Sequence, residues 1–356
     1  MAEADKPTKT VHLSEEAPSR RSLLKRSMRA VLFCIAAITL AGSVVRFTVQ
    51  DRYLLSAIVF YATPLPLLLL GASCCTLSAG VRRRRAAGVR WLVFCALLGA
   101  IWSEEDWKFR DPPQSVPDIA ADDISVLFWN LARREDLSAA AAFIRRQDPD
   151  IVGLVEVQGD IPGWKKFWKE QLPHHDVSAL GSNMYLLTKG RSGESIPHSL
   201  GNGSQARQIQ IHLRGQSCEV VLVDIFAHPL ISRQRALQKL AEIAESLAQS
   251  PLVVLGDFNT PQDSIHLQPL RVHHKLAFEV AGRGYGPTWP IPLPLMQLDQ
   301  IWTNGWLIPI RCRHNWAWAS DHLPVEVTIR SFPVEDGADV DLMNQTSSHD
   351  KLPVAH

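Results

Sequence analysis

The chain has 356 residues, which exceeds one ordinary domain and suggests about two structural units. Lys and Arg number 37 against 36 Asp and Glu, so the formal net charge is only +1. This balance excludes a global electrostatic field that would draw the protein to nucleic acid or to acidic lipid. Any contact with phosphate groups must therefore be local.

Three apolar segments occupy the N-terminal third of the chain. They are "AVLFCIAAITLAGSVV" (30–45), "YLLSAIVFYATPLPLLLLGASCCTLSAGV" (53–81) and "AAGVRWLVFCALLGAIWS" (86–103). A membrane-spanning helix needs about 20 apolar residues, so the second segment qualifies directly. The other two qualify if flanking Arg side chains reach to the membrane interface. We expect a membrane region of about three transmembrane helices at 30–103, with a short interfacial or re-entrant helix as the alternative for the third segment.

The basic residues around these segments predict their orientation. The N-terminus 1–29 holds seven Lys or Arg, the loop 46–52 holds two, and the loop 82–90 holds five. Because Lys and Arg stay on the cytoplasmic side, the chain is expected to run in, out, in, out. The N-terminus is then cytoplasmic and the C-terminal domain lies outside the cytosol.

A change in composition separates the membrane region from that domain. The segment 104–121 contains "FRDPPQSVPD", with three prolines in ten residues, and is expected to be a linker. The tail 332–356 is expected to be disordered. Cys218 and Cys312 are the two cysteines between these limits, and the sequence leaves open whether they pair.

Residues 122–331 alternate between strand and helix patterns. The runs "ISVLFWN", "DIVGLVEV", "VVLVDIF", "LVVLGD" and "VEVTIR" have the β-rich apolar character of buried strands. The stretches "REDLSAAAAFIRRQ" and "SRQRALQKLAEIAESLAQ" have the periodicity of amphipathic helices. This pattern predicts an α/β layered domain with one large core.

Polar residues recur within or at the ends of these apolar runs. They are Asn130, Glu156, His228, Asp257, Asn259, Asp299, Asp321 and His322. Any one of them alone could be a turn or core residue, but the whole set is hard to explain in that way. Carboxylate and amide oxygens suit Mg²⁺ or Mn²⁺, and a His beside an Asp can be held in one tautomer.

Six motifs in order, "LFWN", "DPDIVGLVEV", "AHP", "LGDFN", "LDQIW" and "SDHLPV", carry a family resemblance. The domain resembles the endonuclease/exonuclease/phosphatase superfamily, the deoxyribonuclease I-like metal-dependent phosphoesterases. "GYGPTWP" is similar to bacterial members with N-terminal membrane spans. The resemblance implies a four-layer α/β sandwich, in which two mixed sheets lie face to face with helices outside.

The resemblance also implies roles for the polar set. Glu156 resembles the main Mg²⁺ ligand, Asn130 its neighbour that orients metal or phosphate, and Asp321 a residue near the metal. His228 and Asn259 resemble phosphate contacts, Asp257 the residue that orients or deprotonates the attacking water, and His322 the partner of Asp299. Ala132 stands where some nucleases of the family have an acidic residue, which puts a second metal site in doubt.

These expectations combine into a multi-pass membrane protein of the bacterial inner membrane with an extracytoplasmic, Mg²⁺- or Mn²⁺-dependent phosphoesterase domain. A lipid-linked or small phosphoester is favoured as substrate, because residues 122–330 hold 20 basic and 21 acidic side chains and lack a basic footprint. The apolar loop "GPTWPIPLPLM" also favours it if the loop contacts lipid or an apolar substrate, and a lid packed on the sheet edge is the alternative for this loop. An extracytoplasmic nuclease acting on DNA or RNA and a non-catalytic binding module of the same fold are the alternatives.

Overall fold

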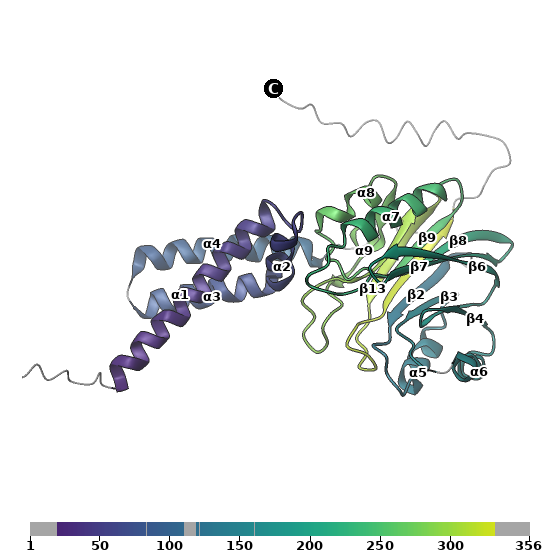
Figure 1. Cartoon of the computed structure of the whole chain (residues 1–356), viewed down its shortest axis with the longest axis horizontal. Coiled ribbons are helices and arrows are strands. Elements are labelled where there is room, and N and C mark those ends of the chain that lie inside the picture. The colour runs from purple at the N-terminus through teal and green to yellow at the C-terminus, as the bar shows by residue number, and fades with distance from the viewer. Residues whose placement is uncertain (1–19, 83, 110–118, 121, 160, 332–356) are drawn as a thin grey trace, which may run out of the picture.

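A computed structural model describes residues 20–82, 84–109, 119–120, 122–159 and 161–331. It consists of a helical N-terminal region and an α/β domain, and helix α2 lies between them (Figure 1). The expected disordered tail 332–356 and most of the expected linker lie outside the described residues.

The helical region contains α1 (Arg20–Phe47), α2 (Leu54–Ala62), α3 (Leu65–Val81) and α4 (Arg85–Glu105). Helices α1 and α4 are each long and apolar enough to cross a membrane. The second expected span is broken, because α2 and α3 meet at an angle of 67° and form a third span only if counted together. Thr63 caps the C-terminal end of α2 and precedes Pro64. Proline disfavours helical backbone in the residue before it, so the helix ends here.

Two six-stranded sheets form the α/β domain. The first has the order β10 (His274–Leu276), β12 (Asp299–Asn304), β9 (Leu252–Asp257), β8 (Gln216–Asp224), β7 (Ser204–Leu213) and β6 (Arg191–Gly201). The second has the order β13 (Leu307–His314), β14 (Val325–Ser331), β2 (Ile124–Asn130), β3 (Ile151–Val155), β5 (Met184–Thr188) and β4 (Asp176–Gly181). Both sheets are mixed, because β8 and β9 are parallel, as are β2 and β3, while the other pairs are antiparallel.

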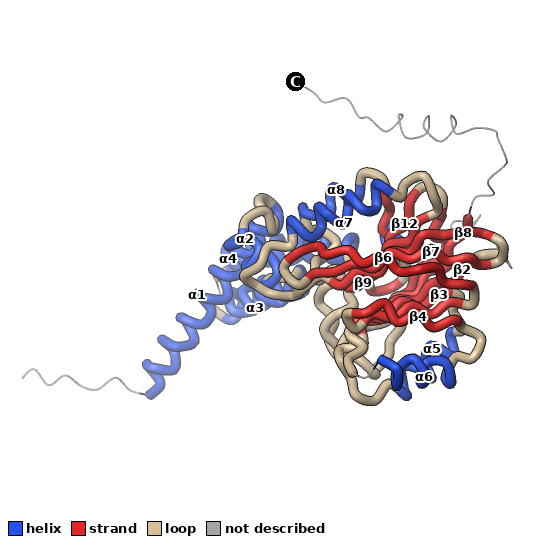
Figure 2. The backbone as a smooth tube through the Cα atoms, turned by 45° about the vertical axis from the view of Figure 1, so that its right-hand side comes forward, coloured by secondary structure: helices blue, strands red, loops and turns tan. Residues whose placement is uncertain are grey.

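Helices cover the outer faces of the two sheets (Figure 2). Helices α7 (Gln234–Ser246) and α8 (Gln268–Arg271), with the 3₁₀ turn Ile265–Leu267, lie outside the first sheet, and α5 (Ser138–Gln147) and α6 (Ile161–Gln171) lie outside the second. Helix α9 (Ala277–Ala281) follows β10. The expected four-layer α/β sandwich is therefore confirmed.

The period-two pattern of β2 shows how the layers are built. Val126 and Phe128 face the core between the sheets, whereas Leu127 and Trp129 pack in the cluster beneath α5 and α6. Gly153 on β3 marks a close approach of the two sheets, because a Cβ there would lie 2.7 Å from Leu255 Cδ1 on β9. Cys218 and Cys312 are free thiols buried in this core, so the disulfide left open by the sequence does not form.

The helical region is joined to the domain by more than the chain itself. Strand β1 (Trp107–Lys108) pairs with β11 (Gly284–Tyr285), so the first part of the expected linker 104–121 is structured. Arg46 at the end of α1 forms a buried ion pair with Asp263, with an N–O distance of 2.8 Å. These contacts fix the helical region beside the loop that follows β9.

Candidate active site

The candidate catalytic residues meet because strand ends from both sheets converge. Asp257 ends β9 and Asp299 begins β12, and the antiparallel register places these two residues opposite each other. Asn130 ends β2 of the other sheet, and its Nδ2 donates a 2.9 Å hydrogen bond to Asp257 Oδ2. Five of the predicted residues are thus brought together by these strand ends and the 320–322 loop: Asn130, Asp257, Asn259, Asp299 and His322.

Asp257 is almost completely buried and accepts several hydrogen bonds. Asn259 donates from its backbone N–H to Oδ1 at 2.8 Å and from its side chain to Oδ2 at 3.0 Å. Burial and, next, the charge of Asp299 raise the pKa of Asp257 to about 8, against the opposing influence of His322. A carboxylate with a raised pKa is a stronger proton acceptor.

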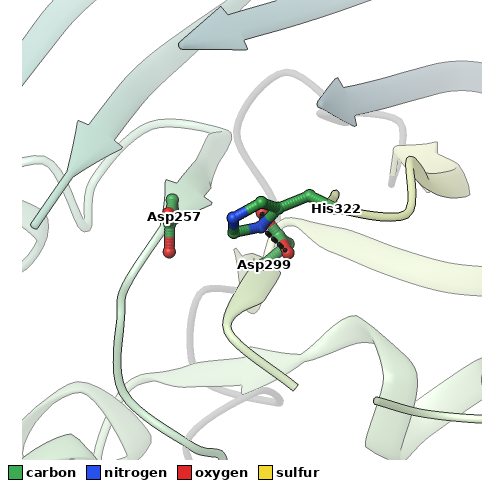
Figure 3. Close-up of side chains that lie close together, drawn as sticks. All are labelled: Asp257, Asp299 and His322. Atoms are coloured by element: carbon green, nitrogen blue, oxygen red, sulfur yellow. Dashed lines mark hydrogen bonds and ion pairs between the residues drawn. The ribbon is translucent and has the colours of Figure 1, made fainter. Parts of the chain in front are cut away.

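His322 and Asp299 form a buried pair at the centre of the site (Figure 3). The Nδ1 of His322 lies 2.8 Å from Asp299 Oδ2, and the imidazole lies between Asp299 and Asp257. Burial by itself lowers the pKa of His322, but the charge and hydrogen bond of Asp299, with smaller effects of Asp257 and Asp321, raise it to about 10. This imidazole is therefore held as a cation with one nitrogen committed to Asp299.

A pocket of about 610 Å³ opens over this cluster, within the usual size range of ligand sites. Glu156, Asp257, Asn259, Asp321 and His322 all line it. The predicted Glu156 and Asp321 thus share one cavity with Asp257 and His322.

Two sets of residues could hold a cation. Asp257, Asp299 and His322 have ligand atoms within 4.8 Å of one another. However, Asp299 and His322 already bond each other, and Asp257 is hydrogen-bonded by Asn130 and Asn259. Asp321 Oδ1, in contrast, is buried without a hydrogen-bond partner among the described residues. Glu156 and Asp321 line the same pocket, and their carboxylate oxygens are of the ligand type that a hard divalent cation prefers.

Backbone in the left-handed region surrounds the site. Glu156 has φ 55° and Asn259 has φ 45°, and Ala132 and Arg133, which follow β2, have φ 49° and 54°. Non-glycine residues rarely adopt this region, and it is enriched at functional sites. The turn at Ala132 also brings Arg133 to 3.2 Å from the Glu156 carboxylate.

His228 is the predicted site residue with the weakest link to this cluster. Its ring stacks on Phe226, and its Nδ1 accepts the N–H of Leu230 at 3.2 Å. The flanking Ala227 and Pro229 line the pocket, so the segment borders the cavity even though these contacts of His228 lie within its own loop.

Two charged residues of this region were missed from the sequence. Asp224 ends β8 next to the site, and burial followed by the charge of Glu156 raises its pKa to about 6. Its position at the end of an apolar strand was the available signal. Arg233 lines the pocket and is buried, although it lies at the start of the predicted amphipathic helix, where a basic side chain is normally solvated.

A sequence model described as "Endonuclease/Exonuclease/phosphatase family" matches residues 127–322, which is more than half of the chain. The chain belongs to the endonuclease/exonuclease/phosphatase family. The matched segment runs from β2 to the loop that carries His322, and so contains all of the predicted site residues. Enzymes of this family hydrolyse phosphoesters and depend on divalent metal ions.

Solved structures of this family are similar to the chain at low sequence identity. D. rerio TDP2 complexed with a single-strand DNA product is 14% identical over 59% of this chain and 99% of its own, with a TM-score of 0.49. A family member from Bacteroides vulgatus is 18% identical over 59% and 99%, with a TM-score of 0.48. A mannosyl-6-phosphatase from Bacteroides thetaiotaomicron is 16% identical over 58% and 99%, with a TM-score of 0.47. No curated protein matches the chain at a significant level.

Proposed function

We propose that this endonuclease/exonuclease/phosphatase family member is a membrane-anchored, divalent-metal-dependent phosphoesterase that uses an activated water. The observation that carries the proposal is the single pocket in which Asp257, hydrogen-bonded by two Asn side chains, faces the buried His322–Asp299 pair. Such a pocket combines a proton acceptor with a fixed cation, which hydrolysis of a phosphoester requires.

The residues divide the chemistry between them. Asp257 orients the water and accepts its proton, and Asn130 and Asn259 hold the carboxylate in one orientation. His322, kept cationic by Asp299, donates a hydrogen bond to a phosphoryl oxygen and stabilises the negative charge that develops there. Trp129 Nε1 donates to the carbonyl of His322 at 2.9 Å and so fixes the loop that carries the imidazole.

Glu156 and Asp321, with Asn130, are the residues that would hold Mg²⁺ or Mn²⁺. When bound, the ion would supply Lewis-acid stabilisation of the phosphoryl oxygens. The unpartnered Oδ1 of Asp321 supports this assignment from the structure itself. His228 is proposed as a phosphate contact at the rim of the pocket.

Helices α1 and α4, with the bent pair α2 and α3, are proposed as the anchor in the bacterial inner membrane, with the catalytic domain extracytoplasmic. We favour a lipid-linked or small phosphoester as the substrate. The near equality of basic and acidic side chains in residues 122–330 supports this preference over nucleic acid.

The test is hydrolysis of bis-p-nitrophenyl phosphate by the full chain in detergent. We expect turnover that is lost with EDTA and restored by Mg²⁺ or Mn²⁺, and an Asp257→Ala variant slower by about 100-fold or more. Asp122→Asn, at an exposed position outside the site, is the matched control. Wild-type rates in Asp257→Ala, or metal-independent turnover, would refute the proposal, and turnover of plasmid DNA without ester turnover would favour a nuclease.

A further inference from the structure

The active-site pocket is not made by the family domain alone. Ile58, Tyr61 and Ala62 of helix α2 line the same cavity as Asp257 and His322. Helix α2 ends at Ala62, whereas the family match begins at residue 127. It belongs to the helical N-terminal region, beside the domain in Figure 1. One wall of the pocket therefore comes from the proposed membrane anchor.

Helix α2 is held in this place by buried polar contacts. Asp51, which is 1% exposed, accepts the hydroxyl of Tyr61 at 2.8 Å and the backbone N–H of Ile265 at 3.1 Å. It also accepts the hydroxyl of Ser264. Ser264 and Ile265 lie in the segment that follows Asn259, whereas Tyr61 belongs to α2. Asp51 therefore ties α2 to the segment next to the catalytic carboxylate.

Tyr61 in turn holds a cation inside the pocket. The guanidinium of Arg233 lies 4.3 Å from the centre of the Tyr61 ring. Arg233 is 9% exposed, and its Nε is buried without a hydrogen-bond partner among the described residues. A buried guanidinium nitrogen without a hydrogen-bond partner is costly unless an anion or another acceptor completes its hydrogen bonds. An anionic substrate group is the natural partner in a cavity that also holds Asp257 and His322.

Apolar side chains also line the pocket. They include Ile58, Ala62, Ala227, Pro229, Met296 and Leu298. The pocket thus combines charged side chains, among them Asp257, His322 and Arg233, with apolar side chains from α2 and from the domain.

We propose that α2 is a substrate-binding element, and that the substrate is a phosphoester carrying a hydrocarbon chain. The phosphoryl group contacts His322 and Arg233, and the chain lies along Ile58 and Ala62 toward the membrane anchor. This inference rests on the proposed function and deepens it. It assigns Arg233 a phosphate contact, Tyr61 the positioning of that guanidinium, and Ile58 the recognition of the chain.

Two probes with the same scissile bond test the inference: methyl p-nitrophenyl phosphate and dodecyl p-nitrophenyl phosphate. In both, water attacks phosphorus and the bond to p-nitrophenolate breaks, which leaves an alkyl phosphate. Burial of a few methylene groups predicts a kcat/KM for the dodecyl ester at least about tenfold above that of the methyl ester. The full chain in detergent micelles is used, at fixed Mg²⁺.

A matched pair of variants separates pocket binding from simple partition of the ester into micelles. Ile58→Gln is expected to reduce the dodecyl-to-methyl ratio to near one. Leu55→Gln, on the same helix but 79% exposed and away from the pocket, is expected to keep the wild-type ratio. A ratio that survives Ile58→Gln, or a wild-type ratio near one, would overturn the inference.

A second pair tests the guanidinium. Arg233→Gln should lower kcat/KM for both esters by about tenfold or more, whereas Arg235→Gln, exposed two residues away, should not. Tyr61→Leu should reproduce part of this loss, and Tyr61→Phe, which keeps the ring face, should restore activity. Wild-type rates in Arg233→Gln would remove Arg233 from the site.

If the wild-type chain cleaves neither ester, the proposed function itself fails, whereas cleavage of both without chain preference rejects this inference alone.

Discussion

His322 and Asp299 are expected to act as one unit rather than as two independent contributors. The Nδ1 of His322 is within 3.1 Å of both carboxylate oxygens of Asp299, and both residues are buried. Asp299 is 0% exposed, so we expect it to act through its neighbours, above all through the imidazole that it orients. Side chains linked in this way show strongly non-additive effects when both are replaced.

A double-mutant cycle tests this unit. Asp299→Asn and His322→Gln should each lower kcat on bis-p-nitrophenyl phosphate by about 100-fold or more, and the double variant should be little worse than either single variant. Pairing either change with Asp122→Asn, an exposed control, should give only the loss of the single active-site variant, because Asp122→Asn adds little of its own. Additive losses in the double variant would show that the two residues act separately.

The sequence identified Asp257, Asn259 and Asp299 because each interrupts or ends an apolar run, a position that has a physical meaning in an α/β sheet. Arg233 could not be found in this way. It lies at the start of an amphipathic helix, where a basic side chain is normally solvated, but it is buried and Tyr61 from a distant segment packs against its guanidinium. Contacts between segments far apart in sequence leave no local pattern.

At the scale of elements, continuous apolar runs such as "LVVLGD" predicted the central strands, and the structure confirms β9 at Leu252–Asp257. The bend between α2 and α3 was not predicted, because apolar composition outweighed the two prolines of "TPLP". Strand β6 was also not singled out. Exposed and buried residues do not alternate regularly along this strand, as expected for a strand at the sheet edge.

The pairing of β2 with β14 depends on a carboxylate that precedes β2. Asp123 accepts the Nε of Arg330 at 2.7 Å and the Nη2 at 2.7 Å, and the side-chain hydrogen bond from Arg330 is the main cause that lowers its pKa. Asp123→Asn should lower the free energy of unfolding by about 1.5–3 kcal/mol near neutral pH. Thermal unfolding of the full chain in detergent measures this loss, with the neighbouring exposed Asp122→Asn as control.

The stability difference between wild type and Asp123→Asn should depend on pH. A carboxyl group whose pKa is lowered in the folded state stabilises the fold above its unfolded pKa, and this contribution is lost as the pH falls through the folded value. The difference in unfolding temperature between wild type and Asp123→Asn should therefore be constant at neutral pH and shrink in acid, below the ordinary range of an Asp. A difference that stays unchanged at acid pH would mean that the carboxylate charge is not its source.

At the scale of the whole molecule, the basic residues of the helical region gather away from the catalytic domain. Helices α1 and α4 both run toward the domain, so the start of α1 and the connection between α3 and α4 lie at the opposite end (Figure 1). That end carries Lys25, Arg26 and Arg29 on α1, Arg82 and Arg84 between α3 and α4, and Arg85 at the start of α4. Basic residues remain on the cytoplasmic side, so this arrangement predicts an extracytoplasmic active site beside α2, at the extracytoplasmic surface of the inner membrane.

Reporter fusions in a bacterial host test this topology. A reporter that is active only outside the cytosol should be active when fused after Arg330 and inactive when fused after Arg85, because the α3–α4 connection should remain inside. Replacing Arg82, Arg84 and Arg85 with Glu should weaken this asymmetry, whereas replacing the basic residues near the domain, Arg46 excepted because it pairs with Asp263, should not. Activity after Arg85 combined with inactivity after Arg330 would invert the orientation and place the pocket, with its α2 wall, at the cytoplasmic surface.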